Sequence, residues 1–424
     1  MRLLYSALYY CLVPVILLRM LWRSREAPDY RRRLAERFGF FAADPGRNGR
    51  PVIWVHAVSV GETLAAAPVV EALLERYPGH RMAVTTTTPT GSERVRRLFG
   101  DRVFHVYCPW DLPGAVRRFL RATEPELLII METELWPNLL HCSRARDCHT
   151  LLANARLSAR SARGYQRFAG ITREMLGNLD TVAAQSAADG ERLLELGLAA
   201  DRLHITGSIK FDLTLDDALR ARAAELQALL GTAERPVLVV ASTHAGEDEQ
   251  VLAAFAELRK SQPDCLLVLV PRHPERFDGV YQMCVDAGWS VCRRSLGEVP
   301  GPGDAILLGD TMGELLVFLG AATVAVIGGS LVEHGGHNAL EASAWGVPVV
   351  TGPHMFNFAE ISELLVNAGA MIMLPDPAGL GDCLAGLLAD ASRRDAMGAA
   401  GRRVLAENRG ALERLLELID QALS

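Results

Sequence analysis

The sequence has no pair of cysteines at the C-x-x-C spacing of a zinc site, because its eight cysteines are scattered along the chain. We therefore expect reduced thiols, mostly in the core, and a cytosolic setting for the bulk of the chain. The sequence also has no G-x-x-x-x-G-K-[ST] phosphate loop, no low-complexity tract and no short-period repeat. A net charge of -6 does not indicate a polyanion binder, so we expect no nucleic-acid partner.

The sequence does have enough apolar residues for large cores. Of its 424 residues, 50% are hydrophobic and 22% are charged, which is typical of a folded protein. A chain of this length predicts two domains of roughly 150–200 residues each. We expect a membrane anchor over residues 1–22, a basic linker over 23–50, an N-terminal domain over 51–215 and a C-terminal domain over 216–424.

The N-terminus carries a long apolar run. Residues 3–18 read LLYSALYYCLVPVILL, with Ser6 as the one plainly polar interruption. A membrane-spanning helix needs about 20 apolar residues, and this run with the RMLW that follows borders on that length. Basic residues after the run predict an inner-membrane anchor with the remaining chain on the cytoplasmic side; they are Arg19, Arg23, Arg25, Arg31, Arg32 and Arg33. A buried N-terminal helix is the alternative, and a cleavable signal is disfavoured because no small-residue cleavage site is evident.

Short apolar runs alternate with longer amphipathic segments after residue 51. Continuous apolar runs are typical of strands that are buried on both faces of a parallel sheet. The pattern pauses near GSIKFDLTLDD (207–217) and then restarts. It therefore predicts two Rossmann-like α/β halves, with ligands outside the carboxyl ends of the strands in a cleft between the halves. The expected strands are 52–56, 82–88, 103–107, 127–131, 150–154 and 181–185, then 236–243, 266–270, 305–310, 324–329, 347–352 and 370–374.

In the second half, polar motifs stand where expected strands end. LLVLVPRHPERF places Arg272 and His273 directly after a strand, and LLGDTMGEL does the same for Met312, Gly313 and Glu314. Arg272 can supply charged donors to phosphate oxygens. The sequence therefore predicts that this half binds a phosphorylated ligand.

A glycine-rich loop in GGSLVEHGGHNALEASAWG leads into an expected helix, where backbone N–H groups can approach a phosphate. Asn338 can meet that phosphate, and Glu341 can accept hydrogen bonds from ribose hydroxyls. The alternative is that these two residues only cap the helix. His334 and His337 form an H-x-x-H, but no third ligand is obvious and two glycines separate them, so we expect no metal site.

The first half differs at the corresponding turn. HAVSVGET (56–63) lies between an expected strand and an expected helix but offers Glu62 where a phosphate loop has lysine. The helix dipole stabilises an anion there, and an ionised carboxylate can accept a proton from a bound hydroxyl. The alternative is a first-turn glutamate that only complements the dipole. METELWPN adds Glu132 and Glu134 after a strand, and GSIKFD adds Lys210 near the junction of the halves; each is either a site residue or a solvated surface charge.

Together these motifs resemble those of bacterial 3-deoxy-D-manno-octulosonic acid (Kdo) transferases of lipid A biosynthesis. The resemblance covers essentially the whole chain, with HAVSVGET, TTTTPTG, METELWPN, GSIKFD, PRHPERF, DTMGEL and GGHNALEASAWGVPVV in that order after the apolar N-terminus. Each string is weak alone, but their joint order is specific. NALE differs from the family, which commonly has proline where Ala339 stands; the change affects a side chain beside a backbone contact.

The resemblance implies an α/β GT-B fold of two Rossmann-like domains and an inverting transfer of Kdo from CMP-Kdo to a tetraacyl lipid A precursor, without a cofactor. It implies that Glu62 accepts the proton and that Glu132 and Lys210 stabilise the transition state. It also implies that CMP is held by Arg272, His273, Met312, Gly313, Glu314, Asn338, Ala339, Leu340 and Glu341. Departing CMP is already charged and needs cations rather than a proton; Lys210 and Arg272 are candidates, without a bound metal.

Two other classes of protein remain. GT-B-like sugar-nucleotide epimerases share the plan of two Rossmann-like domains, but a membrane anchor serves no purpose for their soluble substrates. A non-catalytic, membrane-associated nucleotide-binding protein would bind CMP without any need for Glu62. The apolar N-terminus favours the transferase, because an enzyme held at the bilayer has a raised effective concentration near an acceptor with acyl chains.

Overall fold

The computed structural model describes residues 1–25, 28–44 and 46–424. These residues divide into two compact units. The first unit contains Met1–Asp212 and Arg409–Ser424, and the second contains Leu213–Asn408. Residues 26, 27 and 45, which fall in the expected linker over 23–50, lie outside the described residues.

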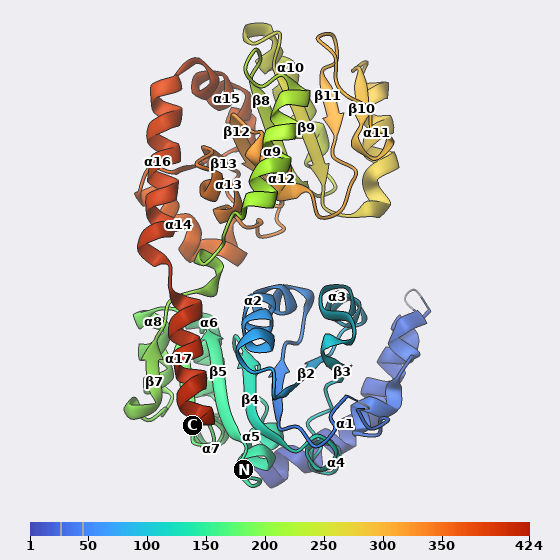
Figure 1. Cartoon of the computed structure of the whole chain (residues 1–424), viewed down its shortest axis with the longest axis vertical. Coiled ribbons are helices and arrows are strands. Elements are labelled where there is room, and N and C mark those ends of the chain that lie inside the picture. Colours follow the sequence, from blue (N-terminus) through green and yellow to red (C-terminus); the bar gives the residue numbers. More distant parts are fainter. Residues whose placement is uncertain (26–27, 45) are drawn as a thin grey trace. The chain divides into compact units, whose positions relative to one another are not determined.

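The first unit is built on a parallel sheet (Figure 1). Within the described residues this sheet has seven strands, in the order β3-β2-β1-β4-β5-β6-β7. Alternate residues of β1 enter different cores: Trp54 packs with Phe119 on one face, and Ile53 packs with Val70 on the other. Burial on both faces explains why the strands have continuous apolar sequences. The strands are β1 (Val52–His56), β2 (Arg81–Thr86), β3 (Phe104–Tyr107), β4 (Pro125–Met131), β5 (His149–Ala155), β6 (Thr181–Ala184) and β7 (Leu203–Ile205).

Some helices of the first unit begin at a residue whose side chain accepts a hydrogen bond from a free N–H group of the first turn. The Ser59, Thr88 and Ser186 hydroxyls accept hydrogen bonds from the first turns of α2, α3 and α8. The α-helices are α1 (Arg2–Arg23), α2 (Val60–Arg76), α3 (Pro89–Phe99), α4 (Pro113–Thr123), α5 (Pro137–Arg144), α6 (Ala159–Gln166), α7 (Ala169–Leu176), α8 (Ala187–Glu195) and α17 (Ala411–Leu423). The 3-10 helices are η1 (Pro28–Arg31), η2 (Leu34–Phe38), η3 (Gly100–Arg102), η4 (Ala200–Arg202) and η5 (Ile209–Phe211).

The second unit repeats this plan. In the described part of the chain its parallel sheet has seven strands, in the order β10-β11-β9-β8-β12-β13-β14. The strands are β8 (Val237–Thr243), β9 (Leu266–Pro271), β10 (Val291–Arg293), β11 (Ile306–Leu308), β12 (Val324–Ile327), β13 (Val349–Thr351) and β14 (Met371–Met373). The α-helices are α9 (Asp217–Leu230), α10 (Asp248–Ser261), α11 (Phe277–Asp286), α12 (Leu315–Gly320), α13 (Leu340–Trp345), α14 (Ala359–Asn367), α15 (Leu380–Ala389) and α16 (Ala391–Asn408). The 3-10 helices are η6 (Pro274–Arg276), η7 (Arg294–Leu296), η8 (Phe356–Phe358) and η9 (Pro377–Gly379).

The expected strands are all present, and the two Rossmann-like units confirm the predicted fold class. The sequence pattern missed β7 and β10. Both are three-residue strands at a sheet edge. Their residues are not fully buried, so neither strand needs the continuous apolar run by which the others were predicted.

The end of the chain differs from the expected domain over 216–424. Residues 409–424 belong to the first unit. Asp212 holds this segment, because its carboxylate accepts hydrogen bonds of 2.6 Å from the N–H groups of Gly410 and Leu412. Leu415 and Ile419 of α17 are buried in the core that α2 covers. The assignment of these residues to the second domain was therefore wrong.

The expected linker over 23–50 also contributes to the first unit. Arg37 in η2 is only 3% exposed. Its Nη2 donates a 2.8 Å hydrogen bond to the carbonyl oxygen of Thr87, and its guanidinium stacks 4.3 Å from the ring centroid of Tyr107. This part of the segment is packed structure rather than a linker.

Candidate active site

Glu62 and Glu132 lie at the topological switch point of the first sheet. β1 and β4 are neighbours in that sheet. From β1 the chain adds β2 and β3 on one side, and from β4 it adds β5, β6 and β7 on the other side. In parallel sheets the carboxyl ends of two such strands form the usual ligand site. Glu62 follows β1, in the first turn of α2, and Glu132 directly follows β4. The fold therefore brings together two candidates that are far apart in the sequence.

Glu62 forms a capping box with Ser59. Its backbone N–H donates to Ser59 Oγ at 3.3 Å, and Ser59 Oγ donates to Glu62 Oε1 at 2.9 Å. The N–H of Val58 donates to Glu62 Oε2 at 2.7 Å. These contacts hold the carboxylate at one place at the helix start. The dipole interpretation and the active-site interpretation of Glu62 are thus compatible.

The acidity of Glu62 is strongly shifted. The side chain is only 9% exposed. The pKa of its carboxyl is raised to about 7, mainly by burial and also by the negative charges of Glu134 and Glu132, while hydrogen bonds from Val58 and Ser59 act to lower it. A base whose pKa lies near neutral pH is half ionised there and can both take up and release a proton. Such shifts cluster at functional sites.

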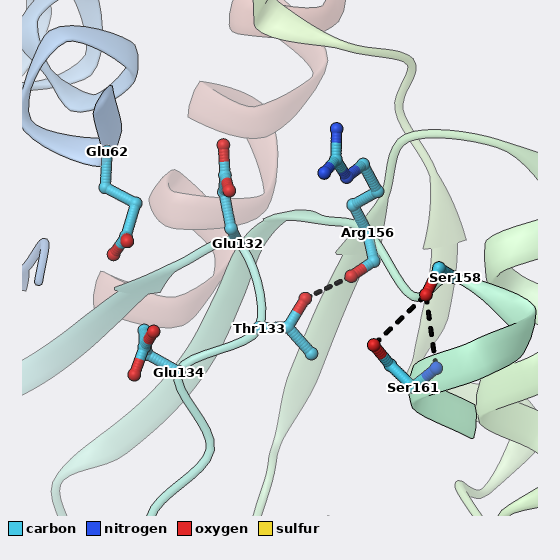
Figure 2. Close-up of a pocket in the computed structure, with 7 residues that line it drawn as sticks. All are labelled: Glu62, Glu132, Thr133, Glu134, Arg156, Ser158 and Ser161. Atoms are coloured by element: carbon cyan, nitrogen blue, oxygen red, sulfur yellow. Dashed lines mark hydrogen bonds between the residues drawn. The ribbon is translucent and has the colours of Figure 1, made fainter. Parts of the chain in front are cut away.

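A pocket of about 180 Å³ opens beside these carboxylates. Figure 2 shows Glu62 directed from α2 toward the segment that follows β4. Glu132 has a φ of 56°, in the left-handed region that few non-glycine residues adopt, and its N–H donates to the carbonyl of Ala153 at 2.9 Å. The residues that line the pocket are Glu62, Glu132, Thr133, Glu134, Arg156, Ser158 and Ser161.

Four of these lining residues were not named as candidates from the sequence; one is Thr133, which stands between Glu132 and Glu134. Arg156, Ser158 and Ser161 follow β5, the next strand in the sheet. Arg156 accepts a hydrogen bond at its carbonyl oxygen from the Thr133 hydroxyl (Figure 2), which ties the two strand ends together. The only available signal was their position after an expected strand, which many surface residues share.

Lys210 lies in η5 and belongs to the first unit. The adjacent Ile209 is buried, and its N–H donates to Asn154 Oδ1 at 3.2 Å. This contact fixes the segment beyond the carboxyl end of β5. Lys210 is half-buried, but it is not among the residues that line the pocket around Glu62.

In the second unit, Arg272, Asn338 and Glu341 form one electrostatic group. Burial raises the pKa of Glu341 to about 7, while the positive charge of Arg272 and a hydrogen bond from Asn338 act to lower it. Asn338 Oδ1 also accepts a 3.2 Å hydrogen bond from the N–H of Leu340. This contact satisfies one N–H of the first turn of α13 (Leu340–Trp345), but the N-cap residue is Ala339, which forms no side-chain cap hydrogen bond. Ala339 and Leu340 are fully buried, so their side chains are packed inside the second unit.

The side chain of Glu314 is engaged within the protein. Its carboxylate accepts hydrogen bonds from Arg222 at 3.0 Å, Arg294 at 3.1 Å and Thr311 at 2.6 Å. Hydrogen bonds from Arg294 lower the pKa of Glu314 to about 2, with burial opposing them. The preceding Gly313 has a φ of 86°, a conformation that glycine adopts without strain. Any contact of the 312–314 segment with a ligand is thus best made by its backbone and by the exposed Met312.

Two family models match this chain. The model described as "3-Deoxy-D-manno-octulosonic-acid transferase (kdotransferase)" matches residues 32–213, and the model described as "Glycosyl transferases group 1" matches residues 297–404. The 3-deoxy-D-manno-octulosonic acid transferase of Haemophilus influenzae is 44% identical over 421 residues, which are 99% of this chain and 98% of that protein. This chain belongs to the 3-deoxy-D-manno-octulosonic acid transferase family. The Bordetella pertussis transferase of the same name is 41% identical over 422 residues, 97% of each chain.

Solved structures of other members of the fold also match. The UDP-GlcNAc 2-epimerase from Neisseria meningitidis, bound to UDP-GlcNAc, gives a TM-score of 0.60 at 13% identity over 88% of this chain and 100% of that chain. A glycosyltransferase from Rickettsia africae gives 0.58 at 12% identity over 88% and 99%. Identities this low show the fold alone. Membership in the 3-deoxy-D-manno-octulosonic acid transferase family, in contrast, shows that this chain is a glycosyltransferase.

Three histidines of the second unit, His244, His334 and His337, lie close together. Of these, the sequence had indicated only His334 and His337, as an H-x-x-H. His244, which follows β8, was not predicted as a site residue. Nε2 of His244 lies 2.9 Å from Nε2 of His337, so one nitrogen donates a hydrogen bond to the other. The centroid of the His244 ring lies 3.8 Å from the centroid of the His334 ring. Burial, together with neighbouring positive groups, lowers the pKa of His244 to about 4 and that of His337 to about 3. The described residues contain no group of three or more His, Cys, Asp or Glu side chains that could hold a metal ion.

Proposed function

We propose that this protein transfers Kdo from CMP-Kdo to a lipid A precursor, with inversion at the anomeric carbon, in lipopolysaccharide biosynthesis. Family membership supports the donor and the reaction class. The observation that carries the proposal is Glu62, a carboxylate with a pKa of about 7 that lines a polar pocket at the switch point of the first sheet. The tetraacyl disaccharide bisphosphate is the acceptor.

Glu62 acts as the general base in this proposal. Its carboxylate takes the proton of the acceptor hydroxyl while the acceptor oxygen forms a bond to the anomeric carbon of Kdo. The bond between that carbon and the CMP phosphate oxygen breaks, and CMP leaves with both electrons. Because the oxygen attacks opposite the leaving group, the configuration inverts. General-base catalysis of this kind contributes about 10²–10⁴-fold.

Charge that develops on CMP needs positive partners rather than a proton. We assign Arg272 and the backbone around Asn338, Ala339 and Leu340 to the CMP phosphate, and Glu341 to the ribose. In the same proposal Lys210 and Glu132 stabilise the transition state, Lys210 by its positive charge. His273 and the 312–314 segment complete the CMP site.

The proposal includes no metal or other cofactor, because the chain itself supplies the cations. Transfer should therefore continue when the purified enzyme is treated with excess EDTA and assayed without added metal. Loss of transfer on chelation, with recovery on addition of Mg²⁺, would contradict this part of the proposal.

Membrane association is the last part of the proposal. Among the described residues, one helix, α1, is long and apolar enough to cross a membrane. The acceptor stays in the bilayer through its acyl chains, so an enzyme at the inner membrane with its two units on the cytoplasmic face meets both substrates. Sedimentation of the protein with membrane vesicles tests this association.

The decisive experiment is mass spectrometry of the lipid product. The purified full-length protein is incubated with CMP-Kdo and the tetraacyl lipid A precursor, and we expect a lipid heavier by Kdo together with free CMP. The same preparation with UDP-N-acetylglucosamine should show no epimerisation. CMP binding without any lipid product would instead identify a non-catalytic nucleotide-binding protein.

A further inference from the structure

The first turn of α1 is hydrogen-bonded to the first unit. Arg2 Nη1 and Ser6 Oγ each donate to Asn138 Oδ1 at 3.0 Å. Asn138 lies in α5 and is fully buried. Its Nδ2 donates to the carbonyl of Asp111, and its N–H donates to the Asp111 carboxylate, at 2.8 and 3.0 Å. Burial raises the pKa of Tyr5, and its phenol lies close enough to the same carboxylate for the negative charge of Asp111 to raise that pKa as well.

The remainder of α1 continues along the same unit. Apolar side chains of α1 pack on a cluster formed by Trp110, Leu112 and Ala115, before and within α4. These side chains follow the i, i+4, i+7, i+8, i+11 spacing of one helix face; they are Tyr9, Val13, Ile16, Leu17 and Met20. Figure 1 shows α1 running beside α4 and α5. The helix is therefore docked from its first turn to its last.

The opposite face of α1 is apolar and uncovered. Exposure of its large side chains ranges from 43% at Leu12 to 77% at Leu3; the others are Leu4, Leu8, Tyr10, Val15, Leu18, Leu21 and Trp22. An exposed stripe of this length indicates an interaction surface. Exposed arginines stand at its end and beyond it, namely Arg19, Arg23, Arg25, Arg31 and Arg32, and these residues match the charge of anionic lipid headgroups.

A docked α1 cannot cross a bilayer. A helix of 22 residues is about 33 Å long, close to the thickness of the hydrocarbon core. If it spanned, the elements packed along it would enter the hydrocarbon with it. These elements include the carboxylate of Asp111 and the amide of Asn138, which are costly to place there. The docking contacts and a spanning orientation therefore exclude each other.

We propose that α1 lies in the plane of the inner membrane as a monotopic helix, with its exposed apolar face in the acyl-chain boundary of an anionic cytoplasmic leaflet and its other face on the first unit. This inference rests on the proposed membrane association and specifies its form. It places Met1 on the same side of the membrane as the active site, whereas a spanning anchor places Met1 on the opposite side. A docked helix also fixes the pocket around Glu62 relative to the membrane surface.

The first test locates the N-terminus. The full chain carries a protease-cleavable epitope before Met1 and is expressed in cells from which right-side-out and inside-out inner-membrane vesicles are made. We expect added protease to remove the epitope in inside-out vesicles only. Removal in right-side-out vesicles would overturn the proposal. Cosedimentation with the vesicles, measured first, reports membrane association separately from orientation.

The second test compares the two faces of α1. Single cysteines for spin labelling are introduced by Leu8→Cys and Val15→Cys on the exposed face and by Val13→Cys and Leu17→Cys on the docked face. The background has the native Cys11, Cys292 and Cys383, which are not buried, replaced by serine. On vesicles of phosphatidylethanolamine and phosphatidylglycerol, we expect high oxygen accessibility at both exposed positions and protection at both docked positions. Equal accessibility on the two faces, with depth greatest at the helix centre, would overturn the proposal.

Discussion

Ser59 and Glu62 exchange hydrogen bonds: the Ser59 hydroxyl donates to Glu62 Oε1 at 2.9 Å, and the Glu62 N–H donates to Ser59 Oγ at 3.3 Å. A capping box usually serves only the helix start. Here the same carboxylate also lines a pocket with two other glutamates. The helix cap thus positions the candidate base, and the two roles share one side chain.

Replacing the candidate base should separate binding from transfer. We expect Glu62→Gln to reduce the rate of Kdo transfer by about 10²–10⁴-fold, because a neutral amide cannot accept the acceptor proton. CMP affinity measured by calorimetry should stay within a few fold. Glu75→Gln, an exposed residue of the same helix, is the matched control and should be fully active. Near-normal transfer by the Glu62 variant would refute its assignment as the base.

The pH dependence of transfer should follow the ionisation of Glu62. Burial raises the pKa of Glu62 to about 7, so kcat/KM should fall as the pH drops below 7. Glu134→Gln removes a negative charge that raises this pKa, so the acid limb should move to lower pH. Ser59→Ala removes a hydrogen bond that lowers the pKa, so the limb should move to higher pH. Identical profiles in both variants would show that another group limits the rate.

Glu62→Gln should also stabilise the fold in alkaline solution. The pKa of Glu62 is raised by burial from 4.5 to about 7, so ionisation favours the unfolded state. This penalty is absent below about pH 4.5, grows up to pH 7 and then stays constant, on the order of 3 kcal/mol at about 1.4 kcal/mol per pKa unit. The variant should therefore melt at a higher temperature than the wild type at pH 8 and at an equal temperature near pH 4.5. An equal difference at both pH values would contradict the buried ionisation.

Arg272 should matter for the nucleotide. Its charge acts on both Glu341 and His337, which places it within the group that we assign to CMP. We expect Arg272→Ala to weaken CMP binding by about tenfold or more, since a charge-assisted contact contributes roughly 1.5–3 kcal/mol. Arg403→Ala, an exposed residue of α16, serves as the control in calorimetry. Unchanged affinity in the Arg272 variant would remove this residue from the site.

We expect Glu314 to hold the 312–314 segment in place through its hydrogen bonds, rather than to contact the nucleotide with its charge. Hydrogen bonds from Arg294 hold its pKa at about 2, below the ordinary 4.5, so its stabilising contribution is complete above pH 4.5 and is lost as the pH falls through 2. We expect Glu314→Gln to lower the melting temperature and, by loosening the 312–314 segment, to weaken CMP binding at all pH values between 6 and 9. Glu275→Gln, which is exposed, should do neither. Normal melting and normal CMP affinity in the Glu314 variant would contradict this role.

The strands could be predicted from the sequence because burial on both faces demands apolar residues at every position. The strands Val52–His56 and Leu266–Pro271 are fully buried, and their sequences, VIWVH and LLVLVP, are almost continuously apolar. β7 and β10 were missed because they are short, partly exposed edge strands without that constraint. The candidate base could be named because its turn between a strand and a helix carries an unusual carboxylate and because the motif order indicated the family.

The sequence by itself therefore determined the two α/β halves, the family and the main candidate residues, since these depend on local apolar runs and on short motifs. Only the tertiary structure decided which distant residues meet. The carboxylate of Asp212 accepts a hydrogen bond from the N–H of Gly410, 198 residues further along the chain. Glu134 lies near enough to Glu62 to raise the pKa of Glu62. The uniformly apolar sequence of α1 likewise does not reveal which face is docked, because that depends on Asn138 and Trp110. Hydrogen bonds and charge interactions act through space, and the spacing along the chain does not encode them.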